Sequence, residues 1–313
     1  IIVGGTYAVN MIGAADDGVI YAANLSLDGT TTNFRIYRWA DDNSATTPTV
    51  AFSGNPTPGV ALRWGDTFDV RGSGTNTQIL AASRAGTNVA VFTTSDGVNF
   101  VADSISVSGV NGGAFGLGLA FGASNTFWGK ANGVVPLRQI SFDLATGIGT
   151  VLRSHGPPEV ATTLGPLGIQ PTQNLYAGLA VDTPDHLKLF DLNAANATPI
   201  LIETNNFPSD LENVNGTGSV DFGGDRVFAL DSNNGIMAMQ IIPPFSQITS
   251  IAVLPGGARS LLISADRGQY WIQTSSNLAT WLDVTNLSTT NGTFDFLDSQ
   301  TNIPLRFYRT RTP

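Results

Sequence analysis

The sequence predicts an all-β fold, a β-propeller followed by a small C-terminal β-sandwich module. Three observations predict it: a strand-favouring composition, a strand pattern that repeats along the chain, and the loss of that pattern after Pro244. Of 313 residues, 42% are hydrophobic and only 12% are charged, and there are 35 glycines. So apolar a chain folds around a core. Threonine, glycine and asparagine at its polar positions favour strands and tight turns over helices.

A short strand with a large apolar residue at its centre recurs five times. The centres are Tyr21, Leu80, Trp128, Tyr176 and Phe228, at intervals of 48 to 59 residues. A turn-rich segment precedes each centre and a second strand follows it, as FRIYRW follows VIYAANL. A unit of this size with four short strands matches a propeller blade, and a ring of blades leaves no open sheet edge. We therefore predict a propeller of five blades over residues 1–245.

The fifth unit is one strand short, because Pro243 and Pro244 stop its pattern after IMAMQI. The chain opens with an unassigned apolar strand at residues 1–3. We predict that this strand completes the last blade and closes the ring. Two alternatives stay open: a six-bladed ring of which this chain is a part, and a β-sandwich with Greek-key connections, which regular strand spacing also fits.

Residues 246–313 follow a different pattern, with short strands separated by turn signals such as PGG and TTNG. This length suffices for a small sandwich. In QYWIQTSSNLATW, period-two alternation puts Tyr270 and Ile272 on one face and Trp271 on the other. We expect Trp281 to pack against Tyr270 or Ile272 in the core. The remaining core aromatics are predicted to be Phe294, Phe296 and Phe307. Trp271 alone is then free for a surface contact. The alternative is that the aromatics of this stretch form a sugar-binding strip.

Charge and residue usage exclude several classes of function. The net charge of -9 and the two lysines, Lys130 and Lys188, argue against a nucleic-acid partner. The apolar stretches fall far short of the roughly 20 residues that cross a bilayer. The absence of cysteine excludes disulfides and thiolate metal sites. An acidic, lysine-poor, asparagine-rich chain that starts at Ile1 without a signal peptide fits a mature secreted or cell-surface bacterial protein.

Sequence motifs of common catalytic classes are absent, including the G-x-S-x-G elbow, H-E-x-x-H and the P-loop. The segment DSNNG, residues 231–235, resembles the start of a calcium loop. Its glycine falls one position early, and no glutamate follows at the required distance. A hairpin turn is the better interpretation of this segment.

Blade topology indicates where polar side chains could meet. In an up-and-down blade, the loop between strands two and three lies on the same ring face as the loop to the next blade. Both histidines, His155 and His186, are expected on that face together with Asp182, and we predict these three as catalytic residues. The alternative is that the histidines are ordinary solvated loop residues.

Polar residues of the innermost strands are expected to reach the channel. Four are predicted as ligands of Ca²⁺, which prefers carboxylate, amide and water oxygens: Asn10, Asp66, Asp69 and Asp221. The alternative is that these side chains satisfy backbone donors at turns and strand ends.

Two segments carry a resemblance to known families. The pattern from Tyr270 through Gln273, Asn277 and Trp281 to Arg309 resembles C-terminal β-modules of extracellular proteins from Verrucomicrobia and Planctomycetes. The repeat region, with RWGDTFDVRG and RVFALDSNNGI, resembles an uncharacterised propeller family of those bacteria. The resemblance implies a propeller fold and a secreted setting, and it assigns no chemistry to particular residues.

The predicted acidic site is similar in kind to that of calcium-dependent lactonase propellers. Those proteins have six blades where five are counted here, and their ligand motifs have no residue-by-residue match in this chain. The similarity implies a Ca²⁺-dependent hydrolase of small lactones or esters, with the metal polarising the carbonyl and a histidine as base. The alternative function is a non-catalytic extracellular propeller that recognises glycan or protein through Trp64 and Trp39.

Overall fold

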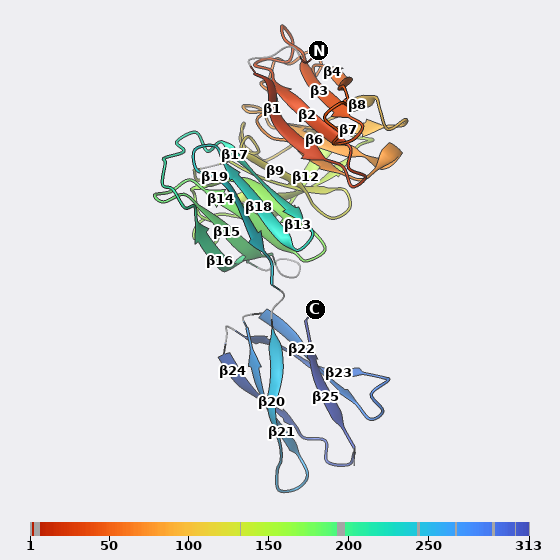
Figure 1. The fold of residues 1–313 in the computed structure, drawn as a ribbon, viewed down its shortest axis with the longest axis vertical. Helices are drawn as coiled ribbons and strands as arrows, with labels where there is room; N and C mark the ends of the chain where they lie inside the picture. Colours follow the sequence, from red (N-terminus) through yellow and green to blue (C-terminus); the bar gives the residue numbers. More distant parts are fainter. Residues whose placement is uncertain are drawn as a thin grey trace. The chain divides into compact units, whose positions relative to one another are not determined.

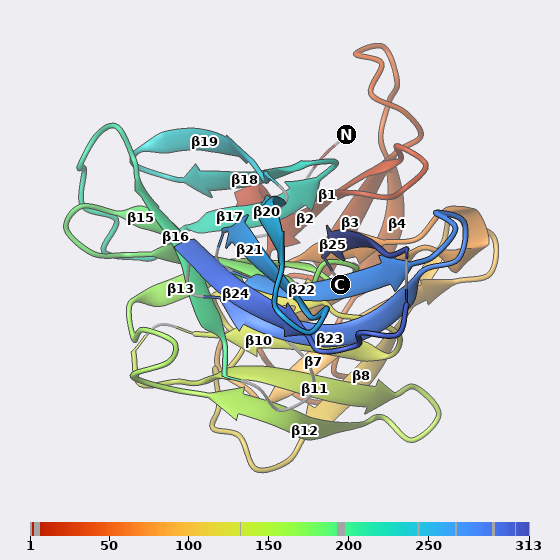
Figure 2. The same cartoon turned by 90° about the horizontal axis from the view of Figure 1, so that it is seen from below.

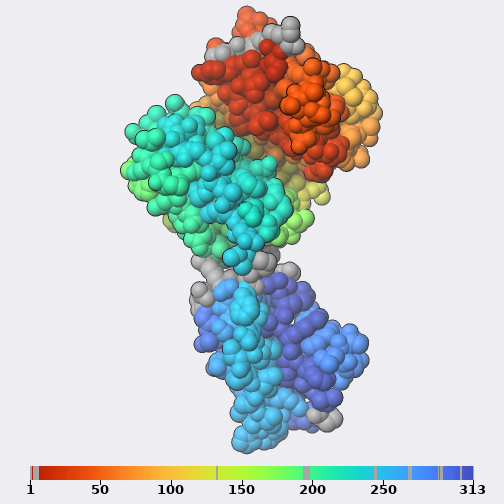
Figure 3. All heavy atoms as spheres, viewed as in Figure 1, coloured from red at the N-terminus to blue at the C-terminus, as the bar shows by residue number. Residues whose placement is uncertain are grey.

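The computed structural model describes residue 2 and residues 7–131, 133–192, 198–242, 245–266, 268–289, 292–303 and 305–312. The chain divides into two units, residues 1–240 and 241–313, each compact by itself (Figures 1 and 3). Over the described residues, the regular structure is β-strand apart from one short 3₁₀ turn, Gly74–Asn76. No helix in that part of the chain is long and apolar enough to cross a membrane.

The first unit consists of successive antiparallel sets of strands. The first two sets are β1 (Tyr7–Ala14), β2 (Ile20–Leu25), β3 (Phe34–Trp39), β4 (Thr49–Gly54), then β5 (Asp69–Arg71), β6 (Gln78–Ala82), β7 (Asn88–Thr94), β8 (Phe100–Val107). The next two are β9 (Gly118–Phe121), β10 (Thr126–Lys130), β11 (Leu137–Asp143), β12 (Ile148–His155), then β13 (Leu164–Gln170), β14 (Leu175–Ala180), β15 (His186–Asp191), β16 (Ile200–Asn206). The last is β17 (Gly218–Gly223), β18 (Arg226–Asp231), β19 (Gly235–Gln240). A short parallel pairing between β8 and β12 joins the second and third sets into one eight-stranded sheet.

The first strand of each set faces a common centre. β1 contacts β5, β5 contacts β9, β9 contacts β13 and β13 contacts β17. Figure 2 shows the sets arranged around that centre. This arrangement is that of a β-propeller-like fold, in which neighbouring sheets bury their apolar faces against each other.

The five predicted repeat strands are confirmed as β2, β6, β10, β14 and β18. The first four are buried along most of their length because each pairs on both edges and packs on both faces. β18 instead alternates, leaving Phe228 40% and Leu230 44% exposed. Its sheet has three described strands, and the predicted fourth strand, residues 1–3, lies outside the described residues apart from Ile2.

The motif RWGD connects the first two sets. Trp64 is fully buried and forms isolated bridges to Ser26 and Ser83. Gly65 follows with φ of +101°, and a Cβ there would lie 2.0 Å from the carbonyl oxygen of Asn24. Only glycine fits that close approach, so the motif fixes how the first two sets meet.

The segment DSNNG is a hairpin turn, as predicted. The Asp231 Oδ1 accepts the N–H groups of Asn233 (2.9 Å) and Asn234 (3.0 Å) between β18 and β19. This is the local side-chain bonding that favours aspartate at turns.

The second unit has two three-stranded sheets. Their strands, in sheet order, are β20 (Ser246–Val253), β21 (Arg259–Ala265), β24 (Gly292–Asp298) and β23 (Leu282–Thr289), β22 (Gly268–Ser275), β25 (Phe307–Arg311). Leu261 and Ile263 from one sheet and Ile272 from the other form the buried core between them. Phe294 and Phe296 pack against this core, as predicted.

Two predictions for this unit are wrong. Trp281 does not enter the core, because its ring lies 4.2 Å beneath the guanidinium of Arg309. Tyr308, rather than Phe307, packs against the core. Register explains the second error: Tyr308 lies opposite Thr274, which shares the inward face of Ile272, so Phe307 points the other way.

Candidate active site

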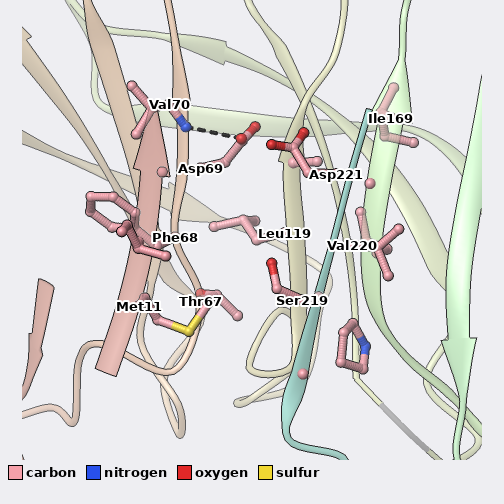
Figure 4. A pocket seen from close by; sticks show the side chains of 18 of the residues that line it. Met11, Thr67, Phe68, Asp69, Val70, Leu119, Ile169, Ser219, Val220 and Asp221 are labelled. Carbon is pink, nitrogen blue, oxygen red and sulfur yellow. Dashed lines mark hydrogen bonds between the residues drawn. The ribbon is translucent and has the colours of Figure 1, made fainter. Parts of the chain in front are cut away.

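A cavity of about 50 Å³ lies at the centre of the first unit (Figure 4). It is lined by residues 11–14, 67–70, 117–120, 166–169 and 218–221, from β1, β5, β9, β13 and β17 and the segments just before β5 and β9. This volume holds a few water molecules, whereas pockets for drug-sized ligands measure roughly 300–1,000 Å³. Any larger molecule must therefore bind at the mouth of the cavity.

Two carboxylates face each other at one end of this cavity. Asp69 is the first residue of β5, and Asp221 lies in β17. Alternation along β17 turns Ser219 to the same side as Asp221. Figure 4 shows the two carboxylates pointing toward one another, with Leu119 beneath them.

Asp69 is held by backbone donors. Its Oδ2 accepts the N–H of Phe121 (2.6 Å) and its Oδ1 accepts the N–H of Val70 (2.9 Å). Burial raises the pKa of Asp69 to about 7, and the charge of Asp221 adds to this, while the two N–H groups and Arg71 oppose it. The side chain keeps some accessible surface because it lines the cavity, but protein encloses the cavity, so desolvation still dominates.

Asp221 is the more exposed partner of the pair. Its Oδ1 accepts the N–H of Phe222 (2.8 Å). The carboxylate reaches solvent at the cavity end, yet the surrounding strands limit its hydration, so burial raises its pKa above the ordinary value.

Arg71, the last residue of β5, supports Asp69 through the neighbouring β9–β10 turn. Its Nη1 donates to the carbonyl oxygens of Gly122 (3.1 Å) and Ser124 (2.7 Å), and its guanidinium lies 4.0 Å from the centre of the Phe121 ring. These contacts hold the β9–β10 turn in place. They thereby position the Phe121 N–H that binds Asp69.

A pair of this kind can perform acid–base chemistry near neutral pH. Two adjacent carboxyl groups avoid being ionised together, so one tends to keep a proton while the other is charged. Asp69 is then the group that titrates near pH 7. A protonated and an ionised carboxyl beside trapped water can donate and accept a proton in one step.

The predicted histidines lie elsewhere. His155 is the last residue of β12 and His186 is the first residue of β15, so both lie at the end of their sheets where the first strands, β9 and β13, start. Asp69 and Asp221 instead lie on the cavity wall, which neither histidine lines. The structure therefore brings together two of the predicted metal ligands and separates them from the predicted base.

Both histidines are buried, 8% exposed for His155 and 9% for His186, and in each the Nε2 has no hydrogen-bond partner among the described residues. His155 stacks on Trp128 and lies 3.8 Å from a carboxylate oxygen of Glu159. Burial is the main cause that lowers the pKa of His155. The Nε2 of His186 lies 3.6 Å from Oδ2 of Asp182, which accepts the hydroxyl of Thr163 (2.9 Å).

The other two predicted ligands have structural partners. The Nδ2 of Asn10 donates to the carbonyl oxygen of Gly65 (2.7 Å). Asp66 forms an ion pair with Arg63 through both carboxylate oxygens. Neither side chain lines the cavity.

The donor set is poor for Ca²⁺. In the described part of the chain, no three His, Asp or Glu side chains gather as metal ligands do. Asp69 and Asp221 supply two carboxylates, both already bound to backbone N–H groups, whereas Ca²⁺ takes six to eight oxygens. The residues present do not fit a calcium site.

Sequence reasoning included Asp69 and Asp221 but did not pair them. A usable signal exists, because each aspartate stands between apolar residues in the first strand of its repeat, in FDV and VDF. Arg71 was missed, since nothing in the local sequence connects it to a turn fifty residues later.

Comparison with known proteins finds distant structural similarity and no family. No family model matches the chain, and no curated protein matches it, so the resemblance to a Verrucomicrobia and Planctomycetes family gains no support. The chain resembles a solved DUF4623 family protein from Bacteroides eggerthii, at 15% identity and a TM-score of 0.49. This similarity covers 84% of this chain and 57% of that protein.

Two further solved structures are distantly similar. A candidate 6-phosphogluconolactonase from Bacteroides uniformis has 12% identity and a TM-score of 0.44, with 91% of this chain and 87% of that one covered. The periplasmic gluconolactonase of Pseudomonas aeruginosa has 11% identity and a TM-score of 0.42, with 92% and 71% covered. Similarities this distant do not bear on the reaction.

Proposed function

We propose that this chain is a hydrolase of small lactones or esters, built on a five-bladed ring, with Asp69 and Asp221 as its catalytic pair. One observation carries the proposal: two carboxylates face each other at one end of a cavity that holds a few water molecules, and burial raises the pKa of one of them, Asp69, to about 7. A pair so arranged suits general acid–base hydrolysis near neutral pH.

The proposed reaction needs one proton on the pair. Asp69, protonated, donates a hydrogen bond to the carbonyl oxygen of the substrate. Ionised Asp221 accepts a proton from water as the water oxygen bonds to the carbonyl carbon. When the C–O bond to the leaving alcohol breaks, that oxygen takes a proton from the pair, which returns with one proton in total. Water and ester become acid and alcohol.

Cavity size limits the substrate. The space beside the carboxylates admits water but no sugar-sized ring. The reactive carbonyl must then sit at the mouth, where Asp221 is exposed. Small lactones and unbranched esters meet this requirement better than bulky ones.

The donor set described above falls short of what Ca²⁺ takes, so the proposed mechanism uses no metal ion. A Ca²⁺-dependent reaction stays a separate proposal. The alternative function, recognition of glycan or protein through Trp64 and Trp39, cannot use Trp64, because this side chain is fully buried and cannot contact a ligand.

The test is a panel of small lactones and aryl esters assayed from pH 5 to 9 in the presence of EDTA. We expect hydrolytic activity that falls as pH rises, with an apparent pKa near 7, because the mechanism needs Asp69 protonated. Asp69→Asn and Asp221→Asn should each lower kcat/KM at least roughly 100-fold, the size of a lost general acid or base. The exposed Asp225, paired with Arg226, provides the control Asp225→Asn, which should retain full activity.

Two results would count against this mechanism. Hydrolysis that survives both cavity substitutions would place the reaction elsewhere. Activity that EDTA abolishes and Ca²⁺ restores would replace the metal-free pair with the predicted metal-dependent site.

A further inference from the structure

Two tryptophan–arginine pairs occupy one face of the second unit. The guanidinium carbon of Arg309 lies 4.2 Å from the centre of the Trp281 ring, and that of Arg311 lies 5.6 Å from the centre of the Trp271 ring. Cross-strand pairing of β22 with β25 places Trp271 opposite Arg311. We define the Trp–Arg face as Trp271, Gln273, Trp281, Asp283, Arg309 and Arg311.

Hydrogen bonds hold this face in one arrangement. The Nε of Arg309 donates to Gln273 Oε1 (2.7 Å), and Gln273 Nε2 donates to Asp283 Oδ1 (2.6 Å). Asp283 Oδ2 lies 3.4 Å from an amino group of Arg311. Gln273 and Asp283 thus link Arg309 to Arg311. A surface ordered before binding loses less conformational entropy when a ligand arrives.

The face is not needed to fill the core. Alternation along β22 puts Ile272 into the core and Trp271 on the opposite side. Arg309 is exposed, and both tryptophans are half-buried. Of the three guanidinium nitrogens of Arg309, only Nε has a hydrogen-bond partner among the described residues. Its terminal amino groups therefore have donors to offer a ligand.

Charge distinguishes this unit from the rest of the chain. Residues 241–313 contain five arginines and four aspartates, a net charge of +1, although the whole chain carries -9. The first unit therefore repels polyanions. An anionic partner that binds this protein would depend on the arginines of the second unit.

We propose that the Trp–Arg face binds an anionic polysaccharide that carries uronate carboxylates. Guanidinium groups bind carboxylates through paired hydrogen bonds. The indole rings offer flat apolar surfaces on which the C–H faces of sugar rings can rest. Tryptophan and arginine are also the residues that most often dominate binding energy at interfaces. Two pairs side by side match a ligand with repeating units.

The test uses the full chain with polygalacturonate as the probe and neutral dextran of similar size as the control ligand. We expect binding to polygalacturonate that weakens as salt rises, and no binding to dextran. Arg309→Gln and Trp281→Ala should each weaken binding about tenfold or more, the cost of truncating a central contact. Arg309→Lys should also weaken binding, because an ammonium lacks the planar fork.

Matched controls separate this site from general charge and from the cavity. Arg226 is an exposed arginine of the first unit, so Arg226→Gln should bind as the unmodified protein does. Asp69→Asn should also bind normally, because this proposal is independent of the hydrolase.

Three outcomes would overturn the proposal. One is equal binding to dextran. Another is unchanged polygalacturonate binding by Arg309→Gln, Arg309→Lys and Trp281→Ala proteins whose melting temperatures stay within roughly 2 °C, which would leave the face a structural stack. The third is an equal loss of binding in Arg226→Gln, which would show unspecific charge attraction.

Discussion

At the residue scale, Asp69 shows how tertiary structure changes the chemistry of a side chain. As an isolated residue it would titrate near 3.8, but in the cavity its pKa is about 7. Backbone donors from Phe121 and Val70 favour the charged form and do not overcome desolvation. The result is a carboxyl that exchanges its proton in the range where most enzymes work.

This raised pKa predicts a pH dependence of stability. The folded state retains the Asp69 proton between about pH 4 and 7, whereas the unfolded state has released it. The free energy of unfolding should therefore fall as pH rises through this range and level off above it. Asp69→Asn removes this contribution, so the variant should gain stability relative to the unmodified protein at pH 8 and not at pH 4.

Thermal unfolding at pH 4, 6 and 8 measures the effect. At pH 8 the unfolding midpoint of Asp69→Asn should lie about 2 °C or more above that of the unmodified protein, since 1 kcal/mol moves the midpoint by roughly 2–4 °C in chains of this size. The exposed-site variant Asp225→Asn should track the unmodified protein. If the stability of Asp69→Asn fell with rising pH as much as that of the unmodified protein, the titration would not belong to Asp69.

At the element scale, β19 is the outermost described strand of a sheet with three described strands, whereas the sheets β1–β4 and β13–β16 have four. Phe228 and Leu230 of the neighbouring strand leave apolar surface exposed. Such an edge invites pairing, and propellers close their rings by adding a strand to it. The prediction that residues 1–3 supply that strand stands untested, and Ile2 is half-buried.

Removing residues 1–3 should therefore destabilise the first unit. Burying an isoleucine or valine side chain contributes roughly 1.5–3 kcal/mol, so a midpoint lower by about 5 °C is a reasonable expectation. Ile2→Asn should have a smaller effect in the same direction. Val134, 82% exposed, provides the control Val134→Asn, which should be neutral. Unchanged midpoints in both N-terminal variants would exclude the latch.

At the scale of the whole molecule, two units have separate cores. Ile36 belongs to a cluster of the first unit, and Ile263 belongs to the core of the second. Both side chains are fully buried. Units that share no core need not unfold together, so the two-state approximation is not expected to hold for the full chain.

Calorimetry should resolve two unfolding transitions. Ile36→Ala should lower the midpoint of one transition, and Ile263→Ala should lower the midpoint of the other. Each substitution should reduce the free energy of unfolding of its unit by about 2–5 kcal/mol because it leaves a cavity in the core. A single transition that both substitutions shift equally would show that the units unfold as one.

Much of the architecture was predictable because it depends on local patterns. The repeated strands around Tyr21, Trp128 and Tyr176 are readable from apolar content and flanking turns. The DSNNG turn follows from aspartate bonding to its own backbone. Core positions in the second unit depend on strand register, which local patterns do not determine. Phe307 and Trp281 were misplaced because one residue of register, or the exact course of a turn, reverses a side chain.

The site was predictable only as a set of candidates. Asp69 and Asp221 lie 152 positions apart in the sequence and face each other at one end of the cavity. Local sequence patterns do not reveal contacts between residues so far apart. The sequence therefore provides no reason to prefer Asp69 and Asp221 over Asn10, Asp66 or the histidines as site residues. The structure ranks them by what each side chain contacts.

The sequence by itself determined the all-β class, the repeating strands and the acidic, cysteine-free character of the chain, because these follow from composition and short-range periodicity. Tertiary structure alone decided which carboxylates meet, that one of them titrates near neutral pH, and that Trp271 and Trp281 lie with arginines on an outer face. Those properties depend on desolvation and on contacts between distant strands. Both arise only when the strands pack around a shared centre or pair in one register.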